Sequence, residues 1–153
     1  MKEDIQILDK KIIRFNKLYQ KFKEQNSIDE VEFKEILCDV LSWMEICIKE
    51  VENLNRIETR EISAIKYANN LKKHSTSIYT YNLNSYALYP SDDLYPSDDL
   101  YPSDFNIWWN TLPLDAPQYT NQYKNYNKYL KGKEIYETIN DIYTIIKKHY
   151  RNN

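Results

Sequence analysis

Glycine is almost missing from this chain, because Gly132 is the only glycine among 153 residues. Phosphate-binding loops of the P-loop and dinucleotide-binding types need several glycines, which let the backbone turn tightly around the phosphate. The commonest nucleotide-binding enzyme folds are therefore excluded. The sequence also has no nucleophile elbow and no paired histidine–glutamate motif, so it predicts neither a serine hydrolase nor a metal or cofactor site.

Cysteine and long apolar runs are scarce as well. Cys38 and Cys47 fall in one helical pattern roughly 13 Å apart, too far for a disulfide, so both are expected to be inert free thiols. No run approaches the ~18 apolar residues of a membrane span, and the charged start MKEDIQILDK has no signal-peptide core. We therefore expect a cytoplasmic protein. Its formal charge of −2 gives no overall attraction to nucleic acid but permits a local basic patch.

Hydrophobic periodicity predicts one mainly α-helical domain over residues 1–153, a four-helix up-and-down bundle. The predicted helices cover residues 3–25, 29–54, 58–74 and 120–150. The first has apolar residues at 3-4 spacing from Ile5 to Phe22, and the second has a broader stripe that indicates several neighbours. Gly132 interrupts the last helix, which either tolerates it at a cost of about 0.8–1 kcal/mol or begins after it.

The composition changes between the third and fourth predicted helices. The runs SIYTYNL and FNIWW are rich in β-branched and aromatic residues, so residues 76–110 are predicted to form a short two-stranded, antiparallel β excursion. The hexamer LYPSDD lies between these runs. It occurs twice in full and a third time with its last letter replaced by Phe105.

This repeat permits three interpretations. Its aspartates suggest calcium, but the alternate carboxylates, central glycine and distal glutamate of an EF-hand are missing. Its tyrosines could form an arm that docks on a partner. Letter-for-letter identity and good turn chemistry favour the third interpretation, a tandem duplication within a loop, where each doubling of length costs about 0.6 kcal/mol.

The stretch most suggestive of chemistry is IKYANNLKKHS, at the end of the third predicted helix. The candidate site has one catalytic residue, His74, and four ligand-binding residues, Asn69, Asn70, Lys66 and Lys73. A histidine beside amides and lysines in a bundle groove can bind phosphate or serve in acid–base chemistry. The simpler interpretation is a helix C-terminus that carries its usual cations.

The layout and this motif resemble the HEPN superfamily. YANNLKKHS is similar to its N-x-x-KH motif, and a segment with proline and aromatic residues follows, as LYPSDFNIWW does here. The resemblance implies a four-helix bundle with an insertion before the last helix and a homodimer that brings two motifs into one cleft. Active members are metal-independent ribonucleases, frequently of toxin–antitoxin or phage-defence systems. In them a histidine acts on the 2′-hydroxyl or leaving group and an arginine stabilises the phosphate charge.

This sequence departs from the superfamily at the arginine. The positions where the arginine is expected hold Tyr67, Ala68 and Asn69, and the nearest cation, Lys66, lacks the bidentate guanidinium fork. The resemblance therefore implies a non-catalytic or degenerate component that binds RNA or a nucleotide phosphate, or that regulates such a system. The alternative is a structural or protein-interaction module that uses the Tyr/Trp-rich excursion and has no nucleic-acid role.

Two further expectations concern aromatic residues. A homodimer is expected to bury aromatic surface such as Trp43 or the Trp108–Trp109 pair. The tyrosines of residues 118–133 either stack on bases or cover the edge of the bundle with their hydroxyls in water.

Overall fold

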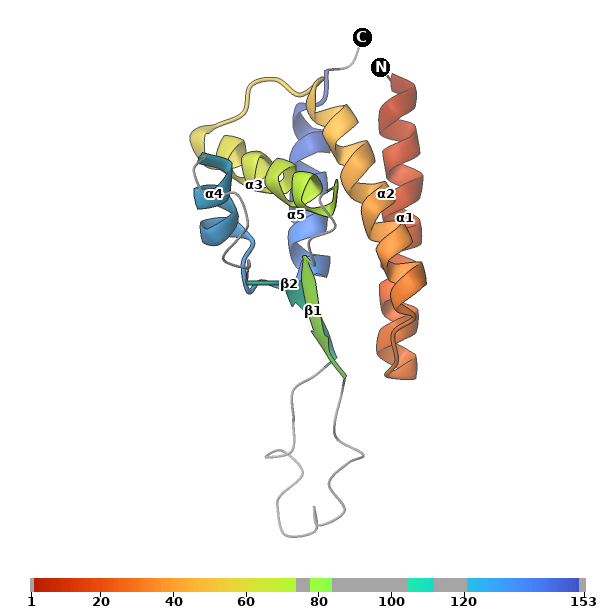
Figure 1. Cartoon of the computed structure of the whole chain (residues 1–153). Helices are drawn as coiled ribbons and strands as arrows, with labels where there is room; N and C mark the ends of the chain where they lie inside the picture. Colours follow the sequence, from red (N-terminus) through yellow and green to blue (C-terminus); the bar gives the residue numbers. More distant parts are fainter. Residues whose placement is uncertain (1, 74–77, 84–104, 112–120, 152–153) are drawn as a thin grey trace, which may run out of the picture.

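The computed structural model describes residues 2–73, 78–83, 105–111 and 121–151. Its elements in chain order are α1 (Lys2–Gln25), α2 (Glu30–Ile48), α3 (Arg56–Lys73), β1 (Tyr79–Asn82), β2 (Asn106–Trp109), α4 (Asn121–Tyr129) and α5 (Ile135–His149). Helices α1, α2 and α5 lie side by side, α3 crosses α2 and α5, and α4 lies against α3 (Figure 1). The mainly helical fold with a two-stranded antiparallel excursion between α3 and α4 is confirmed.

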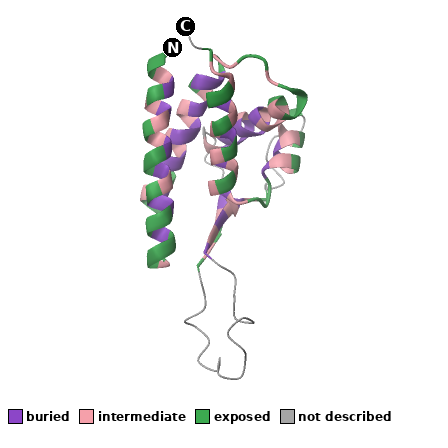
Figure 2. Ribbon diagram, turned by 180° about the vertical axis from the view of Figure 1, so that it is seen from behind, coloured by how far each residue is buried: buried purple, intermediate pink, exposed green. Residues whose placement is uncertain are grey.

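The amphipathic pattern of the first two helices explains the core. The 3-4 spacing of α1 places its apolar face inside, and the broader stripe of α2 is buried from Phe33 to Ile48. Figure 2 shows these buried faces turned towards each other, with the exposed residues outside. Asp29 caps α2, because its carboxylate accepts a hydrogen bond from the backbone N–H of Glu32 at 3.1 Å. Within the described ranges, no helix is long and apolar enough to cross a membrane.

The first and last helices are joined by polar contacts. The side-chain amides of Asn16 and Asn140, which are 124 positions apart, exchange hydrogen bonds of 3.1 and 2.9 Å. The hydroxyl of Tyr143 donates to Asp9, and Lys147 forms an ion pair of 3.1 Å with the same carboxylate. These contacts fix α1 against α5 along one flank of the molecule.

Helix α2 ends at Ile48, so its predicted end at residue 54 is wrong. The reason is a long-range pairing, in which Val51 and Tyr150 form an antiparallel β-bridge. The backbone N–H of Glu52 donates to His149 at 3.1 Å, and that of Arg151 donates to Glu50 at 2.9 Å. Backbone groups that would have extended the helix are satisfied by the segment after α5 instead.

The two strands follow the predicted runs. Tyr79 lies opposite Trp109, and Asn82 lies opposite Asn106, in an antiparallel register. Burial alternates along β2, where Ile107 and Trp109 are inside. The LYPSDD repeat lies in residues 84–104, outside the described residues, so its three interpretations stay predictions.

The single helix predicted over residues 120–150 is wrong, because the structure has two helices there and five in the described residues as a whole. The break falls at Gly132, whose φ of +76° is incompatible with a continuous right-handed helix. The break also serves to dock the chain on β2. The N–H of Gly132 donates to the carbonyl of Trp109, and the N–H of Trp109 donates to Lys133.

Candidate nucleic-acid interface

Helix α3 carries most of the residues predicted to form the site. Lys66, Asn69 and Asn70 lie in its last turns, and Lys73 is its final residue. His74 lies outside the described residues, as does the side chain of Lys73. The proposed catalytic role of His74 therefore stays a prediction, and the geometry bears on the other three residues.

Asn69 and Asn70 point in different directions. Asn69 is buried, with 2% of its surface exposed, and its amide N–H₂ donates to Glu45 of α2. Its amide oxygen is buried and has no hydrogen-bond partner in the described structure. Asn70 is exposed, while Lys66 is partly buried. The two asparagines therefore do not form one ligand-binding pair, since the first is part of the α2–α3 interface.

A lysine outside the predicted ligand set occupies the same interface. The ammonium of Lys72 donates to the backbone carbonyl of Cys38 at 2.7 Å and to the hydroxyl of Ser42, both on α2. A charged group that is taken out of water needs such hydrogen bonds to offset its lost hydration. The end of α3 thus uses Asn69 and Lys72 to hold α2.

A basic groove lies between α3 and α4, and sequence reasoning missed it. It has a volume of about 540 Å³ and is lined by Thr59, Arg60, Ser63, Asn121, Lys124, Asn125 and Lys128. We call this set the α3–α4 groove. No described carboxylate lines it, and within the described residues no acidic side chain pairs with Arg60, Lys124 or Lys128. The groove therefore offers three cations, together with hydroxyl and amide groups, to an anionic ligand.

The tyrosines beside the groove mostly pack within the protein. Tyr126 is fully buried, and its hydroxyl donates to the carbonyl of Asn110 at 2.8 Å. Burial raises the pKa of this hydroxyl, so it stays neutral. Tyr123 meets Tyr67 edge-on with ring centroids 5.9 Å apart, and Tyr129 lies below the ammonium of Lys128 at 5.4 Å. Tyr126 is therefore a core residue that neither stacks on bases nor keeps its hydroxyl in water, while Tyr123 and Tyr129 are partly buried against neighbouring side chains.

An acidic pocket of about 360 Å³ lies where α3 meets the α4–α5 turn and the start of α5. Its carboxylates are Glu61, Glu134, Glu137 and Asp141. Burial raises the pKa of Glu61, and the charge of Asp141 adds to this effect. In the described part of the chain, no group of three or more histidine, cysteine, aspartate or glutamate side chains could hold a metal ion.

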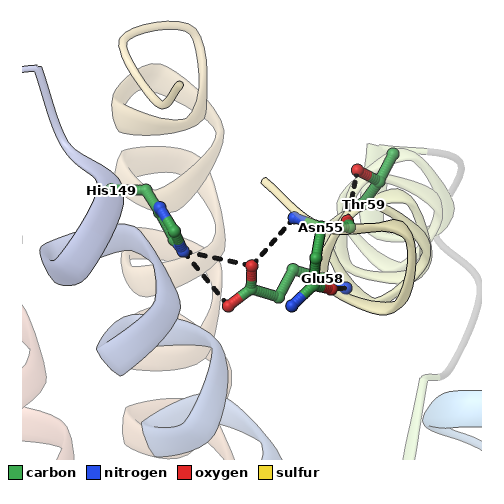
Figure 3. Close-up of polar contacts among 4 residues, drawn as sticks. All are labelled: Asn55, Glu58, Thr59 and His149. Carbon is green, nitrogen blue, oxygen red and sulfur yellow. Dashed lines mark hydrogen bonds and ion pairs between the residues drawn. The ribbon is translucent and has the colours of Figure 1, made fainter. Parts of the chain in front are cut away.

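One histidine lies inside the described structure and contacts α3 (Figure 3). His149 Nε2, at the end of α5, is 3.1 and 3.2 Å from the two carboxylate oxygens of Glu58. Both side chains are mostly buried, with 14% and 13% of their surface exposed. The hydrogen bond from the backbone N–H of Asn55 lowers the pKa of Glu58, and His149 lowers it further.

The tryptophans differ in how much exposed surface they offer to an interface with a second copy. Trp109 is fully buried within its own chain, where its indole N–H donates to Thr138 at 2.6 Å. The expectation that a homodimer buries the Trp108–Trp109 pair is therefore wrong for Trp109. Trp43 and Trp108 are partly buried and keep some exposed surface.

Comparison with known proteins finds no family model, no curated protein and no solved structure that matches this chain. What the candidate interface does must therefore be argued from its own residues.

Proposed function

We propose that this chain is a HEPN-like protein that binds RNA through the α3–α4 groove without cleaving it. The observation that supports the proposal is the groove itself, with Arg60, Lys124 and Lys128 facing one open space. Cations that neutralise phosphates supply most of the affinity for nucleic acid, because they release condensed counterions. Neighbouring Ser63 adds a hydroxyl donor that suits phosphate oxygens, whereas the hydroxyl of Thr59 already donates to the carbonyl of Asn55.

Two features argue against cleavage. The expected arginine positions hold Tyr67, Ala68 and Asn69, so no guanidinium is available there to stabilise a pentacoordinate phosphate. Asn69 is also buried against Glu45, which removes its amide from any cleft at the end of α3. A binding or regulatory role within a toxin–antitoxin or defence system is consistent with both features.

The experiment is a fluorescence anisotropy titration of a labelled mixed-sequence RNA. The variant Arg60→Ala/Lys124→Ala/Lys128→Ala should bind at least about tenfold more weakly near 0.1 M salt. Its plot of log affinity against log salt should be shallower by about 2, because each lost phosphate contact on a single strand removes about 0.7. These changes would mark the groove as the phosphate contact.

The matched control removes three lysines from a distant surface. Lys10, Lys17 and Lys21 are exposed on α1, which lies on the opposite side of the molecule from α4 (Figures 1 and 2). Replacing all three by alanine changes the net charge by the same amount. Equal losses in the two triple variants would mean that only overall charge matters, and the groove would then have no specific role.

A homodimer is a second part of the proposal. After Trp109 is excluded, the partly buried Trp43 on α2 is a candidate for the aromatic contact between copies. Analytical ultracentrifugation should show a dimer that Trp43→Ala converts to monomer. A monomeric wild-type protein at tens of micromolar would refute this part and leave RNA binding standing.

A protein-interaction role for the excursion is the second candidate function. Tyr81 and Leu83 favour it, because these apolar side chains at the end of β1 are 37% and 38% exposed. The variant Tyr81→Ser/Leu83→Ser should then lose a protein partner while keeping its RNA affinity. The RNA titration separates the two candidates, since this variant leaves the α3–α4 groove intact.

A further inference from the structure

The first turn of α3 is fixed by a reciprocal capping arrangement. The backbone N–H of Asn55 donates to the Glu58 carboxylate at 3.0 Å, and the N–H of Glu58 donates to the Asn55 side chain at 2.8 Å. Thr59 adds a bond from its hydroxyl to the carbonyl of Asn55 at 2.9 Å. Glu58 therefore has two roles, because the same carboxylate also contacts His149 (Figure 3).

The histidine end of this contact is anchored by the segment between α2 and α3. The carbonyl of His149 accepts a hydrogen bond from Glu52, and Val51 pairs with Tyr150. An ion pair of 2.6 Å between Arg151 and Glu52 closes the same pairing. These contacts hold the imidazole of His149 beside the first turn of α3, where it meets Glu58.

The residues that follow Glu58 are groove residues. Thr59 and Arg60 come directly after it in the first turns of α3 and line the α3–α4 groove. A shift of this turn would move the guanidinium of Arg60 relative to Lys124 on α4. The contact between α5 and Glu58 is therefore connected, through one turn of helix, to the spacing of the cations that the proposed function uses.

We infer that His149 is a positioning residue for the α3–α4 groove, and that its protonation tightens the contact with Glu58 and thereby strengthens RNA binding. The inference rests on the proposed function. A protonated imidazole makes a charge-assisted hydrogen bond with a carboxylate, which is stronger than the bond that a neutral ring makes. Histidine is the side-chain type used in proteins to respond to pH between 5 and 8, so pH is the variable that tests this inference.

The charges around the pair support this direction. Glu58 is influenced by Lys148 of α5, which favours its ionised form, and lies near Glu61 of α3. Glu52 and Arg151 are paired with each other, and Glu50 lies on the same segment. The N–H of Asn55 and the nearby His149 lower the pKa of Glu58, which favours the charged form of this carboxylate.

His149 is the histidine of the described residues, which makes the test sharp. Anisotropy titrations at about pH 5.5 and pH 8, at one ionic strength, compare wild type with His149→Gln and with the control Lys17→Gln, at an exposed position of α1. Wild type and the control should bind RNA roughly three- to tenfold more tightly at the acidic pH, the range of one charge-assisted contact. His149→Gln keeps a hydrogen-bonding amide, so it should fold but lose this pH dependence.

A second variant checks the other half of the pair. Glu58→Gln should also remove the pH dependence of RNA binding, although His149 remains. In the wild type, hydrogen exchange of the Thr59 backbone amide, divided by its intrinsic rate, should slow on acidification, and in Glu58→Gln it should not. A pH dependence retained by His149→Gln, or lost by Lys17→Gln, would overturn the inference. Tight RNA binding without any pH dependence would overturn it alone, whereas absence of binding at both pH values would overturn the proposed function too.

Discussion

The backbone N–H of Gly132 donates a hydrogen bond of 2.9 Å to the carbonyl oxygen of Trp109, and this bond fastens the α4–α5 turn to β2. The return bond, from Trp109 to the carbonyl of Lys133, is 3.0 Å long. Gly132 therefore lies in the turn between α4 and α5 and attaches this turn to β2.

Gly132→Ala should destabilise the protein by about 1–2 kcal/mol, the usual cost of a left-handed conformation for a residue with a Cβ. A Cβ at this position would meet no atom within 4 Å, so the cost comes from the backbone and not from a clash. Urea unfolding followed by circular dichroism measures the loss. Gly132→Asn is the control and should lose less, because asparagine tolerates this conformation better; equal losses would point to another cause.

The two neighbouring asparagines of α3 should behave differently. Asn69→Ala should lower the free energy of unfolding by about 1–3 kcal/mol, because it removes a buried hydrogen bond to the Glu45 carboxylate. Asn70→Ala, at an exposed position, should change it by less than about 0.5 kcal/mol. Urea titration of both variants provides the comparison, and RNA titration completes it. A large loss of RNA affinity in Asn69→Ala without a loss of stability would return this residue to the binding site.

RNA should stay intact when it is incubated with the wild-type protein without metal. The reason is the missing guanidinium, since the candidate positions hold Tyr67, Ala68 and Asn69. Gel electrophoresis of total RNA, with His74→Ala as the comparison, tests this expectation. Cleavage by the wild type that His74→Ala loses would show a working catalytic site, and the proposal of a non-catalytic protein would fall.

The acidic pocket should make the protein slightly less stable as the pH rises. Burial raises the pKa of Glu134, and the nearby charge of Glu137 raises it further. A carboxyl group with a raised pKa binds its proton more tightly in the folded state, so its penalty is present above that pKa and disappears as the pH falls through it. Glu134→Gln should therefore gain stability at pH 7, by less than about 1 kcal/mol because the group is largely solvated, and gain nothing near pH 4. Urea unfolding at both pH values measures this, and an equal gain at both would indicate an effect unrelated to charge.

Local patterns were sufficient to predict the parts of the fold that depend on nearby residues. The 3-4 spacing from Ile5 to Phe22 predicted α1, and runs rich in β-branched and aromatic residues predicted both strands. Gly132 was recognised as an interruption, yet its effect was decided by docking on Trp109, which no local pattern reports. The predicted end of α2 is wrong for the same reason, because Val51 pairs with Tyr150, which is distant in the sequence.

The candidate interface depended even more on tertiary structure. Arg60 and Lys124 are far apart in the sequence, and they line one groove only because α4 folds back against α3. The lysines at 124 and 128 are one helical turn apart within the tyrosine run, which was the one available signal. Asn69 and Asn70 differ because only Asn69 lies on the side of α3 that faces α2. Two adjacent asparagines in a sequence do not indicate which of them lies on the buried side of the helix.

The contacts between α1 and α5 have a consequence for the order of folding. The partner amide of Asn16 lies 124 positions later in the chain, and the partners of Asp9, Tyr143 and Lys147, are similarly distant in the sequence. During synthesis, α1 and α2 can pair early, but the flank that α5 covers stays open to water until the final helix has left the ribosome. Closure of this flank is a non-local step, and folding rates fall as the mean sequence separation of native contacts grows. We therefore expect nascent chains that lack α5 to be the form of this protein most exposed to aggregation and to chaperones.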